Sequence, residues 1–493
     1  MRVLDCGDYL RVFPQEGDVI PTKMLMGWSQ RRGSSVLQVE NNLVNQMVLG
    51  IYKPKLFSSQ ELLYGEALED YQKADVAKMC SLRRAANFNP MGLGKTVETI
   101  IAMKELGIEN ALIVTPKPIC LQWESQIKKW WPKMAGYIGV HDPDSSICII
   151  NYEKLNSTQT LTKLKRVRHD CLVFDEGHWI KNRTSKRTNN LKEIPADCIF
   201  GLTGTPITRY PDDLWSLLHG IDWRYSGKYY WNFVNHFCDV VEGEHGRDIR
   251  GITKDPAKLA LLNKLIGAIA VRNESVETAY GKQRIYVPLA MAGSQKKLYR
   301  KIRDMVFEEL PENCTISNGA VLAMRLMQAT SWPGLFEPGC AGIKFEWILE
   351  RCRDTDEQIV VFTKFEQTAR ALVNYLGANK VRATSYTGKM SNEIQQRNKK
   401  LFVDGKVQVI VGTIKAMGEG VDELQTNCRI GIMVDRDWSP EINEQCEERL
   451  HRRGQKLPVV IYYLDCKGTF DKHVDQVNLE KSDSIRAALQ EVE

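Results

Sequence analysis

Short runs of apolar residues, each followed by a longer amphipathic stretch, recur along the chain and constrain its fold more than any other feature. Near-continuous apolar runs between helical patterns are typical of strands that are buried on both faces of a parallel sheet. The sequence therefore predicts an α/β fold with two parallel sheets in tandem, each flanked by helices. The first series of runs comprises residues 111–116, 146–152, 171–178 and 198–206, and the second comprises 358–365, 407–413, 429–435 and 458–465.

The two series divide the chain into two large domains, because its 493 residues exceed what one hydrophobic core usually organises. We expect an accessory segment at residues 1–60, a first domain with a helical insertion at 61–283, and a second domain at 284–493. The region 207–345 between the two series is expected to be mostly helical. The join between the domains is placed near "YGKQRIYVPL" (280–289).

Composition narrows the class of protein. Thirteen cysteines are scattered without a CxxC pair, which argues against a disulfide framework and against structural zinc. No apolar stretch is long enough to span a bilayer, and the first residues lack the pattern of a secretory signal. We therefore expect a monomer without zinc or a membrane partner, cytoplasmic if the protein is bacterial or viral and nuclear if it is eukaryotic. The net charge of +6 permits a basic groove for a polyanion without requiring one.

The stretch "MGLGKT" (91–96) has the pattern of a phosphate-binding loop. Gly92 and Gly94 allow backbone N–H groups to turn toward a phosphate, and the helix that follows presents its positive end. Lys95 would bridge the β- and γ-phosphates, and the Thr96 hydroxyl would bind Mg²⁺. The longer loop pattern has a glycine where this chain has Asn89, a residue that tolerates left-handed backbone angles. The alternative is a glycine-rich turn before a helix.

An acidic pair favours the phosphate-binding interpretation. Asp175 and Glu176 end a predicted strand, and the carboxyl edge of a parallel sheet is where such folds bind ligands. We expect Asp175 to hold Mg²⁺ and Glu176 to orient and deprotonate the attacking water. Hydrolysis also needs cations on the developing charge. Arg449 and Arg452 are three residues apart, so we expect both on one helix face; the alternative for this basic helix is a solvated surface.

Taken in order, these motifs resemble those of the superfamily 2 helicases, specifically the SWI/SNF-related branch, whose motor consists of two RecA-like domains. The resemblance covers about residues 65–475. "LIVTPKPICLQWESQIKKW" resembles motif Ia, "IINYEKL" Ib, "DEGH" II, "LTGTP" III, "VVFTKF" IV, "GTIKAMGEGVD" V and "QCEERLHRRGQ" VI, while "LEDYQ" (68–72) is similar to the adenine-recognising segment. The chain departs from the branch at Asn89-Pro90, where an acidic pair is usual, and at Gly177, where alanine is commoner. Its compact layout is similar to the annealing, fork-remodelling members and to bacterial or phage members.

The resemblance implies ATP and Mg²⁺ as cofactors, duplex or branched DNA as partner, and a set of site residues. Those expected to bind ATP are Gln72, Met91, Gly92, Leu93, Gly94, Lys95, Thr96, Gly420, Asp422 and Gln445, with Arg449 and Arg452 reaching the phosphates from the second domain. Those expected to contact nucleic acid are Thr115, Lys117, Tyr152, Thr387, Gly388 and Thr413, and those expected to couple the two sites are His178, Thr203 and Thr205.

The implied function is an ATP-dependent, DNA-stimulated translocase on double-stranded DNA that remodels DNA structures or protein–DNA complexes. A strand-separating helicase and a degenerate motor acting as a DNA-binding scaffold remain alternatives. Two basic runs, 163–169 and 181–187, are compatible with phosphate contacts, although such runs are more often solvated surface.

Overall fold

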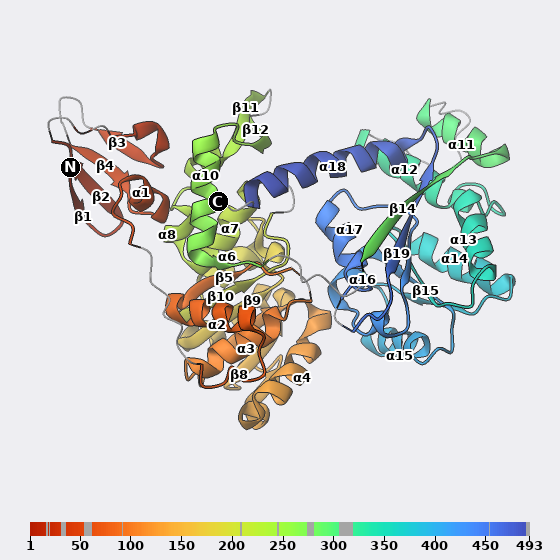
Figure 1. Ribbon diagram of the computed structural model, residues 1–493, viewed down its shortest axis with the longest axis horizontal. Helices are drawn as coiled ribbons and strands as arrows, with labels where there is room; N and C mark the ends of the chain where they lie inside the picture. The colour runs from red at the N-terminus through yellow and green to blue at the C-terminus, as the bar shows by residue number, and fades with distance from the viewer. Residues whose placement is uncertain are drawn as a thin grey trace. The chain divides into compact units, whose positions relative to one another are not determined.

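The computed structural model describes residues 1–15, 18, 20–30, 36–53, 62–90, 92–207, 210–243, 246–273, 281–304, 319–452 and 454–489. The chain forms two compact units (Figure 1), one of residues 1–275 together with 482–493 and the other of residues 276–481. Among the described residues, no helix is both long enough and apolar enough to cross a membrane.

The first unit begins with a small antiparallel sheet. Its strands lie in the order β1-β2-β4-β3, and a short helix follows them. The bounds are β1 Arg2–Asp5, β2 Tyr9–Phe13, β3 Trp28–Gln30, β4 Leu37–Glu40 and α1 Leu43–Val48. Leu10 and Val12 of β2 pack with Leu37 and Val39 of β4 in a core of their own, because alternate residues of a strand point to one face.

The main sheet of the first unit is parallel, and in the described part of the chain its strands lie in the order β13-β5-β10-β9-β6-β8-β7. The four predicted strands are confirmed as β6 Ala111–Thr115, β8 Ile147–Asn151, β9 His169–Asp175 and β10 Ala196–Leu202. The others are β5 Arg84–Asn87, β7 Ile138–Val140 and β13 Ala270–Val271. Alternate residues of β6 belong to two core clusters, Leu112 to one and Ile113 to the other, so both faces of the sheet are covered and the strand reads as a continuous apolar run.

Helices flank this sheet: α2 Asp70–Leu82, α3 Lys95–Glu105, α4 Cys120–Trp130, α5 Thr158–Arg166, α6 Lys186–Lys192, α7 Asp212–Ile221 and α10 Pro256–Ile269. The region predicted to be mostly helical also contains α8 Trp223–Ser226 and α9 Tyr230–Phe237. It includes a β-hairpin that the prediction lacked, β11 Cys238–Gly243 and β12 Gly246–Ile252.

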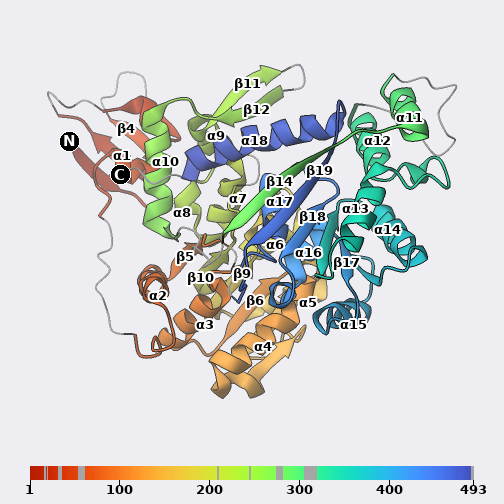
Figure 2. The ribbon, with the colours of Figure 1, turned by 45° about the vertical axis from the view of Figure 1, so that its right-hand side comes forward.

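The second unit is built on another parallel sheet, with strand order β14-β19-β18-β15-β17-β16 among the described residues (Figure 2). The predicted strands are confirmed as β15 Ile359–Thr363, β17 Val409–Thr413, β18 Ile430–Met433 and β19 Val459–Cys466, and β16 is Ala383–Tyr386. The segment near which the join between the domains is expected contains the edge strand β14, Lys282–Leu289, paired with β19. An edge strand buries one side only and tolerates Pro288, so it lacks the apolar run by which the inner strands were predicted.

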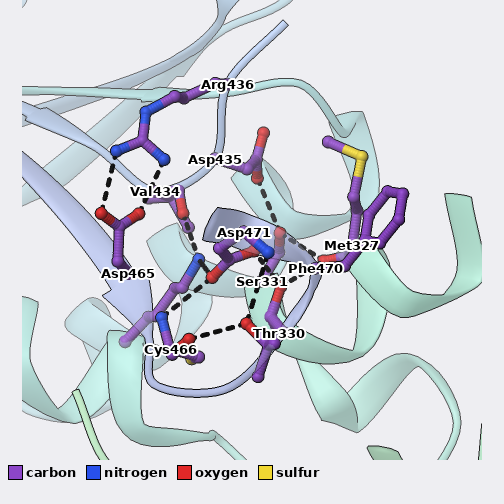
Figure 3. A network of polar contacts seen from close by, with 12 residues as sticks. Met327, Thr330, Ser331, Val434, Asp435, Arg436, Asp465, Cys466, Phe470 and Asp471 are labelled. Carbon is purple, nitrogen blue, oxygen red and sulfur yellow. Dashed lines mark hydrogen bonds and ion pairs between the residues drawn. The ribbon is translucent and has the colours of Figure 1, made fainter. Parts of the chain in front are cut away.

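The helices of the second unit are α11 Gly293–Arg303, α12 Gly319–Ser331, α13 Ile343–Arg353, α14 Glu366–Ala378, α15 Asn392–Val403, α16 Ile414–Gly420, α17 Pro440–Glu447 and α18 Phe470–Leu489. A buried polar network joins several of them to the ends of β18 and β19 (Figure 3). The Lys344 ammonium donates to the Val434 carbonyl at 2.6 Å and pairs with Asp471 at 2.8 Å. Asp471 also accepts from the Thr330 hydroxyl (2.8 Å) and the Cys466 N–H (3.0 Å). Every polar partner of this fully buried lysine is thus supplied by the fold.

Candidate nucleotide-binding site

Three motif segments meet at one edge of the first parallel sheet. The phosphate-binding loop follows β5, the acidic pair ends β9, and Thr203–Thr205 follow β10. β10 lies between β5 and β9, and all three strands are parallel. Their carboxyl ends therefore place the three segments side by side, where open α/β sheets bind ligands.

The phosphate-binding loop has the backbone that its glycines predict. Gly92 and Gly94 have φ angles of 86° and 96°, in the left-handed region. A Cβ on Gly94 would lie 2.4 Å from the Gln72 side-chain nitrogen, so a larger residue would displace Gln72 and would strain the left-handed backbone. Gly94 is the N-cap of α3, which places Lys95 and Thr96 in the first turn of the helix, beside its positive end. Met91 lies outside the described residues.

The adenine-segment candidate Gln72 is bonded to the phosphate-binding loop. Its Nε2 donates to the Leu93 carbonyl at 2.9 Å, and its Oε1 accepts from the Glu69 N–H at 3.1 Å. The Tyr71 hydroxyl donates to the same Leu93 carbonyl at 2.8 Å. The first turn of α2 and the loop are thereby one hydrogen-bonded structure, and adenine recognition by Gln72 stays a prediction.

A buried polar network, which the sequence did not predict, lies behind the loop. The Asn89 side-chain amide donates to Asp75 (2.7 Å) and to Glu98 (3.1 Å), and Glu98 also accepts from Asn87 at 2.7 Å. Asn273 donates to Asp75 at 2.6 Å and to the Asn89 amide oxygen. Burial, reinforced by the charge of Asp75, raises the pKa of Glu98 to about 7. Asn89 stands where the family usually has an acidic residue, and this replacement was the sequence signal for the network. Its amide can donate hydrogen bonds to the carboxylates of Asp75 and Glu98, which another carboxylate could not do.

The loop lysine is held close to the site. The Lys95 ammonium donates to the carbonyls of Asn89 and Pro90 at 2.8 and 3.2 Å. Its charge also acts on Asp175 at the end of β9. The structure thus brings together the lysine and the first carboxylate of the acidic pair.

Asp175 is fixed by three hydrogen bonds. The Trp123 indole N–H donates to one carboxylate oxygen at 2.8 Å and the Glu176 N–H to the other at 2.9 Å. The Tyr152 hydroxyl donates to the Asp175 carbonyl at 2.6 Å. Burial, followed by the charge of Glu176, raises the pKa of Asp175, while Trp123 and Lys95 oppose that shift. The carboxylate is therefore oriented by the fold and electrostatically suited to a cation.

Glu176 has an unusual backbone. Its φ and ψ are 52° and 56°, a left-handed conformation that costs a non-glycine residue about 1–3 kcal/mol and often marks a functional site. Its carboxylate lies 3.3 Å from His178 Nδ1. On the adjacent loop, the Thr203 hydroxyl accepts from the Thr205 N–H at 3.1 Å. The Thr203 N–H in turn donates to the Asn87 carbonyl of β5, so Thr203 and Thr205 lie between the loop and the acidic pair, whereas His178 lies in the turn after Glu176.

The three residues of the first unit that were expected to contact nucleic acid differ in how exposed their side chains are. Lys117 is exposed, and the Thr115 hydroxyl is buried without a hydrogen-bond partner in the described part of the chain. Tyr152 differs from the expectation of a nucleic-acid contact, because its side chain is 0% exposed and its hydroxyl is used by Asp175. Its ring is stacked on Trp179, with centroids 5.7 Å apart. The structure places Tyr152 beneath the acidic pair as a supporting residue.

The arginine pair of the second unit follows a helix instead of lying on one. α17 ends at Glu447, so Arg449 and Arg452 occupy the turns after the helix. The expectation that both arginines lie on one face of a helix was therefore wrong. Both nevertheless contact Asp422, at 3.3 Å and 2.5 Å. Burial raises the pKa of Asp422, but the two guanidinium charges outweigh it and the pKa lies below its usual value. Gly420 ends α16, and Gln445 is buried on α17.

The two arginines differ in their surroundings. Arg449 is 6% exposed and also donates to the carbonyls of Gly418 and Val421. The Arg452 side chain keeps 23% of its surface exposed. Thus Arg449 is bonded within the second unit, whereas Arg452 retains surface for another contact.

The other predicted contacts of the second unit lie at neighbouring strand ends. Thr387 and Gly388 follow β16, and Thr413 ends β17, which pairs with β16. The Thr387 carbonyl accepts from Gln395 at 2.9 Å, and its hydroxyl has no partner within the described residues. The structure brings these three residues together at one sheet edge, and their contact with nucleic acid stays a prediction.

Two family descriptions match the chain. Residues 71–331 match the SNF2-related domain and residues 343–454 the helicase conserved C-terminal domain. The first match contains Gln72, the phosphate-binding loop and the acidic pair, and the second contains the Asp422 cluster. These matches, with the two parallel sheets, confirm the resemblance and the tandem RecA-like fold that the sequence predicted.

Curated relatives are similar over most of this chain. The CHD3-type chromatin-remodeling factor CHR7 of Arabidopsis thaliana is 23% identical over 435 residues, which cover 79% of this chain and 34% of that protein. An uncharacterized ATP-dependent helicase of Mycoplasma pneumoniae is 24% identical over 425 residues, covering 81% and 40%. The probable ATP-dependent DNA helicase CHR12 of Arabidopsis thaliana is 26% identical over 482 residues, covering 87% and 42%. The chain spans less than half the length of each of these relatives.

Among solved structures, the SWI2/SNF2 ATPase core of Sulfolobus solfataricus in complex with dsDNA is 23% identical with a TM-score of 0.42, covering 88% of this chain and 97% of that chain. The SNF2-related domain, at residues 71–331 of 493, matches more than half of the sequence. The chain therefore belongs to the SNF2-related family.

Proposed function

We propose that the protein is an ATP-dependent, DNA-stimulated translocase on double-stranded DNA that remodels DNA structures or protein–DNA complexes. The observation that carries the proposal is the arrangement at the sheet edge of the first unit. There a glycine loop capping α3, a lysine and a buried acidic pair occupy adjacent strand ends. The names of the relatives, an ATP-dependent DNA helicase and a chromatin-remodeling factor, support the same class of activity.

The first unit would bind the triphosphate of ATP. Backbone N–H groups of residues 92–96 would hold the phosphates, and the Lys95 ammonium would exchange its present carbonyl partners for phosphate oxygens. The Thr96 hydroxyl and the Asp175 carboxylate are hard oxygen donors of the kind that Mg²⁺ prefers. Bound there, Mg²⁺ would neutralise charge on the phosphates.

Glu176 would act as the base that positions and deprotonates water, since it directly follows Asp175 at the end of β9 and its charge acts on the Asp175 carboxylate. Of the two arginines, Arg452 is the better candidate for stabilising the phosphoryl group, because Arg449 is bonded to the segment 418–422. Arg449 would then position that segment. Lys117, Gly388 and Thr413 would contact the DNA backbone, where N–H groups, hydroxyls and cations suffice without base readout, whereas Thr387 is only 1% exposed and would support Gly388.

The test is the steady-state ATPase rate of the purified chain, alone and with blunt duplex DNA, forked DNA, single-stranded DNA and RNA. We expect the largest stimulation with blunt or forked duplex DNA, and none in a matched Lys95→Ala variant. Displacement of a third strand from a blunt triplex would then report translocation, and displacement from a tailed duplex would report strand separation. If single-stranded DNA stimulates the ATPase rate and the tailed duplex is unwound efficiently, the proposed function changes from a translocase to a strand-separating helicase. No turnover with any nucleic acid, together with DNA binding, would replace it by a scaffold.

A further inference from the structure

The basic run 181–187 and the end of α6 carry cations that rest on aromatic rings. The Arg183 guanidinium lies 4.5 Å from the Tyr230 ring centroid, and the Lys192 ammonium lies 4.7 Å from that of Trp215. In the part of the chain that the structure describes, neither side chain forms an ion pair with a carboxylate. The rings belong to α7 and α9, which Figure 2 labels together with α6.

The other basic run, 163–169, is different. Lys163 pairs with Asp144 at 2.6 Å, Lys165 pairs with Glu193, and Arg168 pairs with Asp197. These charges are neutralised by neighbours on the surface. The two runs look alike in the sequence, but among the described residues Lys163, Lys165 and Arg168 are ion-paired, whereas Arg183 rests on an aromatic ring without an ion pair.

The two cations are also close to each other. Trp215 and Tyr230 pack edge to face with centroids 5.5 Å apart, so the charges above them are neighbours. Burial and the charge of Arg183 lower the pKa of Lys192 to about 8. Burial and the charge of Lys192 lower the pKa of His219, which packs on Trp215, to about 4. Two like charges held this close would be stabilised by an anion placed between them.

Asp212 also lies at this surface, where its carboxylate accepts a hydrogen bond from the Tyr230 hydroxyl at 3.1 Å. It thereby orients the Tyr230 ring, and among the described residues it forms no ion pair with Arg183 or Lys192. A guanidinium resting on a ring still presents its N–H edge outward, and that edge matches two phosphate oxygens. Rigid aromatic supports also reduce the entropy lost when the side chains are immobilised on binding.

We propose that Arg183 and Lys192, supported by Tyr230 and Trp215, form a binding surface for phosphate groups of the duplex DNA backbone. The proposal rests on the proposed function, since it assumes that the chain binds DNA, and it adds a surface outside the predicted site residues. Through this surface, the segment that follows the acidic pair would bind DNA to the first unit. This binding is electrostatic and does not depend on the base sequence of the DNA.

The test compares the double variant Arg183→Gln/Lys192→Gln with the matched control Lys163→Gln/Lys165→Gln, which removes two ion-paired cations. Fluorescence anisotropy with a labelled duplex is measured across a salt series. We expect weaker binding in the first variant and a plot of log Kd against log salt whose slope falls by about 2, since each phosphate contact contributes about 0.9. The control is expected to keep the wild-type slope. Basal ATPase without DNA and the melting temperature should be unchanged in both.

Charge-preserving exchange, Arg183→Lys/Lys192→Arg, is expected to restore most of the slope, because phosphate neutralisation needs charge more than shape. If the double variant does not fold, the exposed Arg183→Gln alone carries the test with a loss of about 0.9. Equal losses on duplex DNA, single-stranded DNA and RNA would show that phosphates alone are recognised; a loss on RNA only would overturn the assignment to DNA. A slope equal to wild type in a DNA-binding, DNA-stimulated protein would refute this surface and leave the proposed function standing. A wild type that binds no DNA would refute both.

Discussion

At the scale of single residues, Glu176 combines a left-handed backbone with a carboxylate that lies 3.3 Å from His178 Nδ1. We predict that Glu176→Gln keeps ATP and DNA binding, because glutamine preserves shape and hydrogen bonding, but lowers kcat by about two orders of magnitude or more. Single-turnover kinetics with radiolabelled ATP, beside an equilibrium binding measurement, separate the two effects. Wild-type turnover in this variant would remove Glu176 from the role of base.

We predict that substitutions of the two arginines after α17 have different effects, one on the rate of hydrolysis and the other on stability. Arg452→Ala should bind ATP almost normally and slow hydrolysis by about a thousandfold, the lower range for loss of an arginine finger. Arg449→Ala should instead lower the free energy of unfolding by about 2–3 kcal/mol, because it removes buried charge-assisted hydrogen bonds to Gly418 and Asp422. Rapid-quench ATPase assays and urea unfolding distinguish the two. A kinetic defect confined to Arg449→Ala would reverse the assignment.

At the scale of secondary-structure elements, α9 contains a buried histidine whose titration should be visible in stability. His236 is 4% exposed, and burial, with the charge of Lys258, lowers its pKa from 6.5 to about 4. The folded chain thus stays neutral at this residue while the unfolded chain takes up a proton below pH 6.5. Its contribution is complete above pH 6.5 and is lost as the pH falls toward 4, by about 3 kcal/mol in all.

Urea unfolding at a series of pH values checks this prediction. In His236→Leu the free energy of unfolding should decline less steeply between pH 6.5 and 4, whatever its absolute value at neutral pH. His473, which is exposed, provides the control through His473→Leu. Parallel pH profiles for wild type and His236→Leu would contradict a neutral buried imidazole.

At the scale of the whole molecule, each unit has hydrophobic cores of its own on the two faces of its sheet. Lys344 connects α13 to β18 and α18 within the second unit. Its burial opposes the charged form, but the charge of Asp471 outweighs that and keeps its pKa above the usual value. Removal of the lysine leaves a buried carboxylate unpaired, which costs about 3–5 kcal/mol.

We therefore predict that Lys344→Met destabilises the second unit by about 3–5 kcal/mol and leaves the first unit unchanged. Hydrogen exchange of core amides in the two sheets reports each unit separately. The exposed Lys467→Met is the control, and Lys344→Met/Asp471→Asn should recover part of the loss by removing the unpaired charge. Equal loss of protection in both sheets would show that the units unfold as one.

Much of the candidate site was predictable because its chemistry depends on local sequence. Gly92, Gly94, Lys95 and Thr96 are adjacent, so their loop and the first turn of α3 follow from backbone preferences alone. The acidic pair followed from its position at the end of an apolar run. Trp123 was matched only as part of a motif, and its bond to Asp175 is a contact between residues 52 positions apart. No local pattern specifies such a contact.

The sequence by itself determined the two parallel sheets, the order of the motifs and the residue types at the phosphate edge, because apolar periodicity and glycine placement act over a few neighbouring residues. Only the tertiary structure decided that β14 is a strand, that Tyr152 supports the acidic pair from beneath, and that Arg449 and Arg452 differ in exposure. It also decided which cations of the two basic runs form ion pairs and which rest on aromatic rings. Burial, hydrogen-bond partners and local electric fields arise from residues far apart in the chain, and they exist only once the chain has folded.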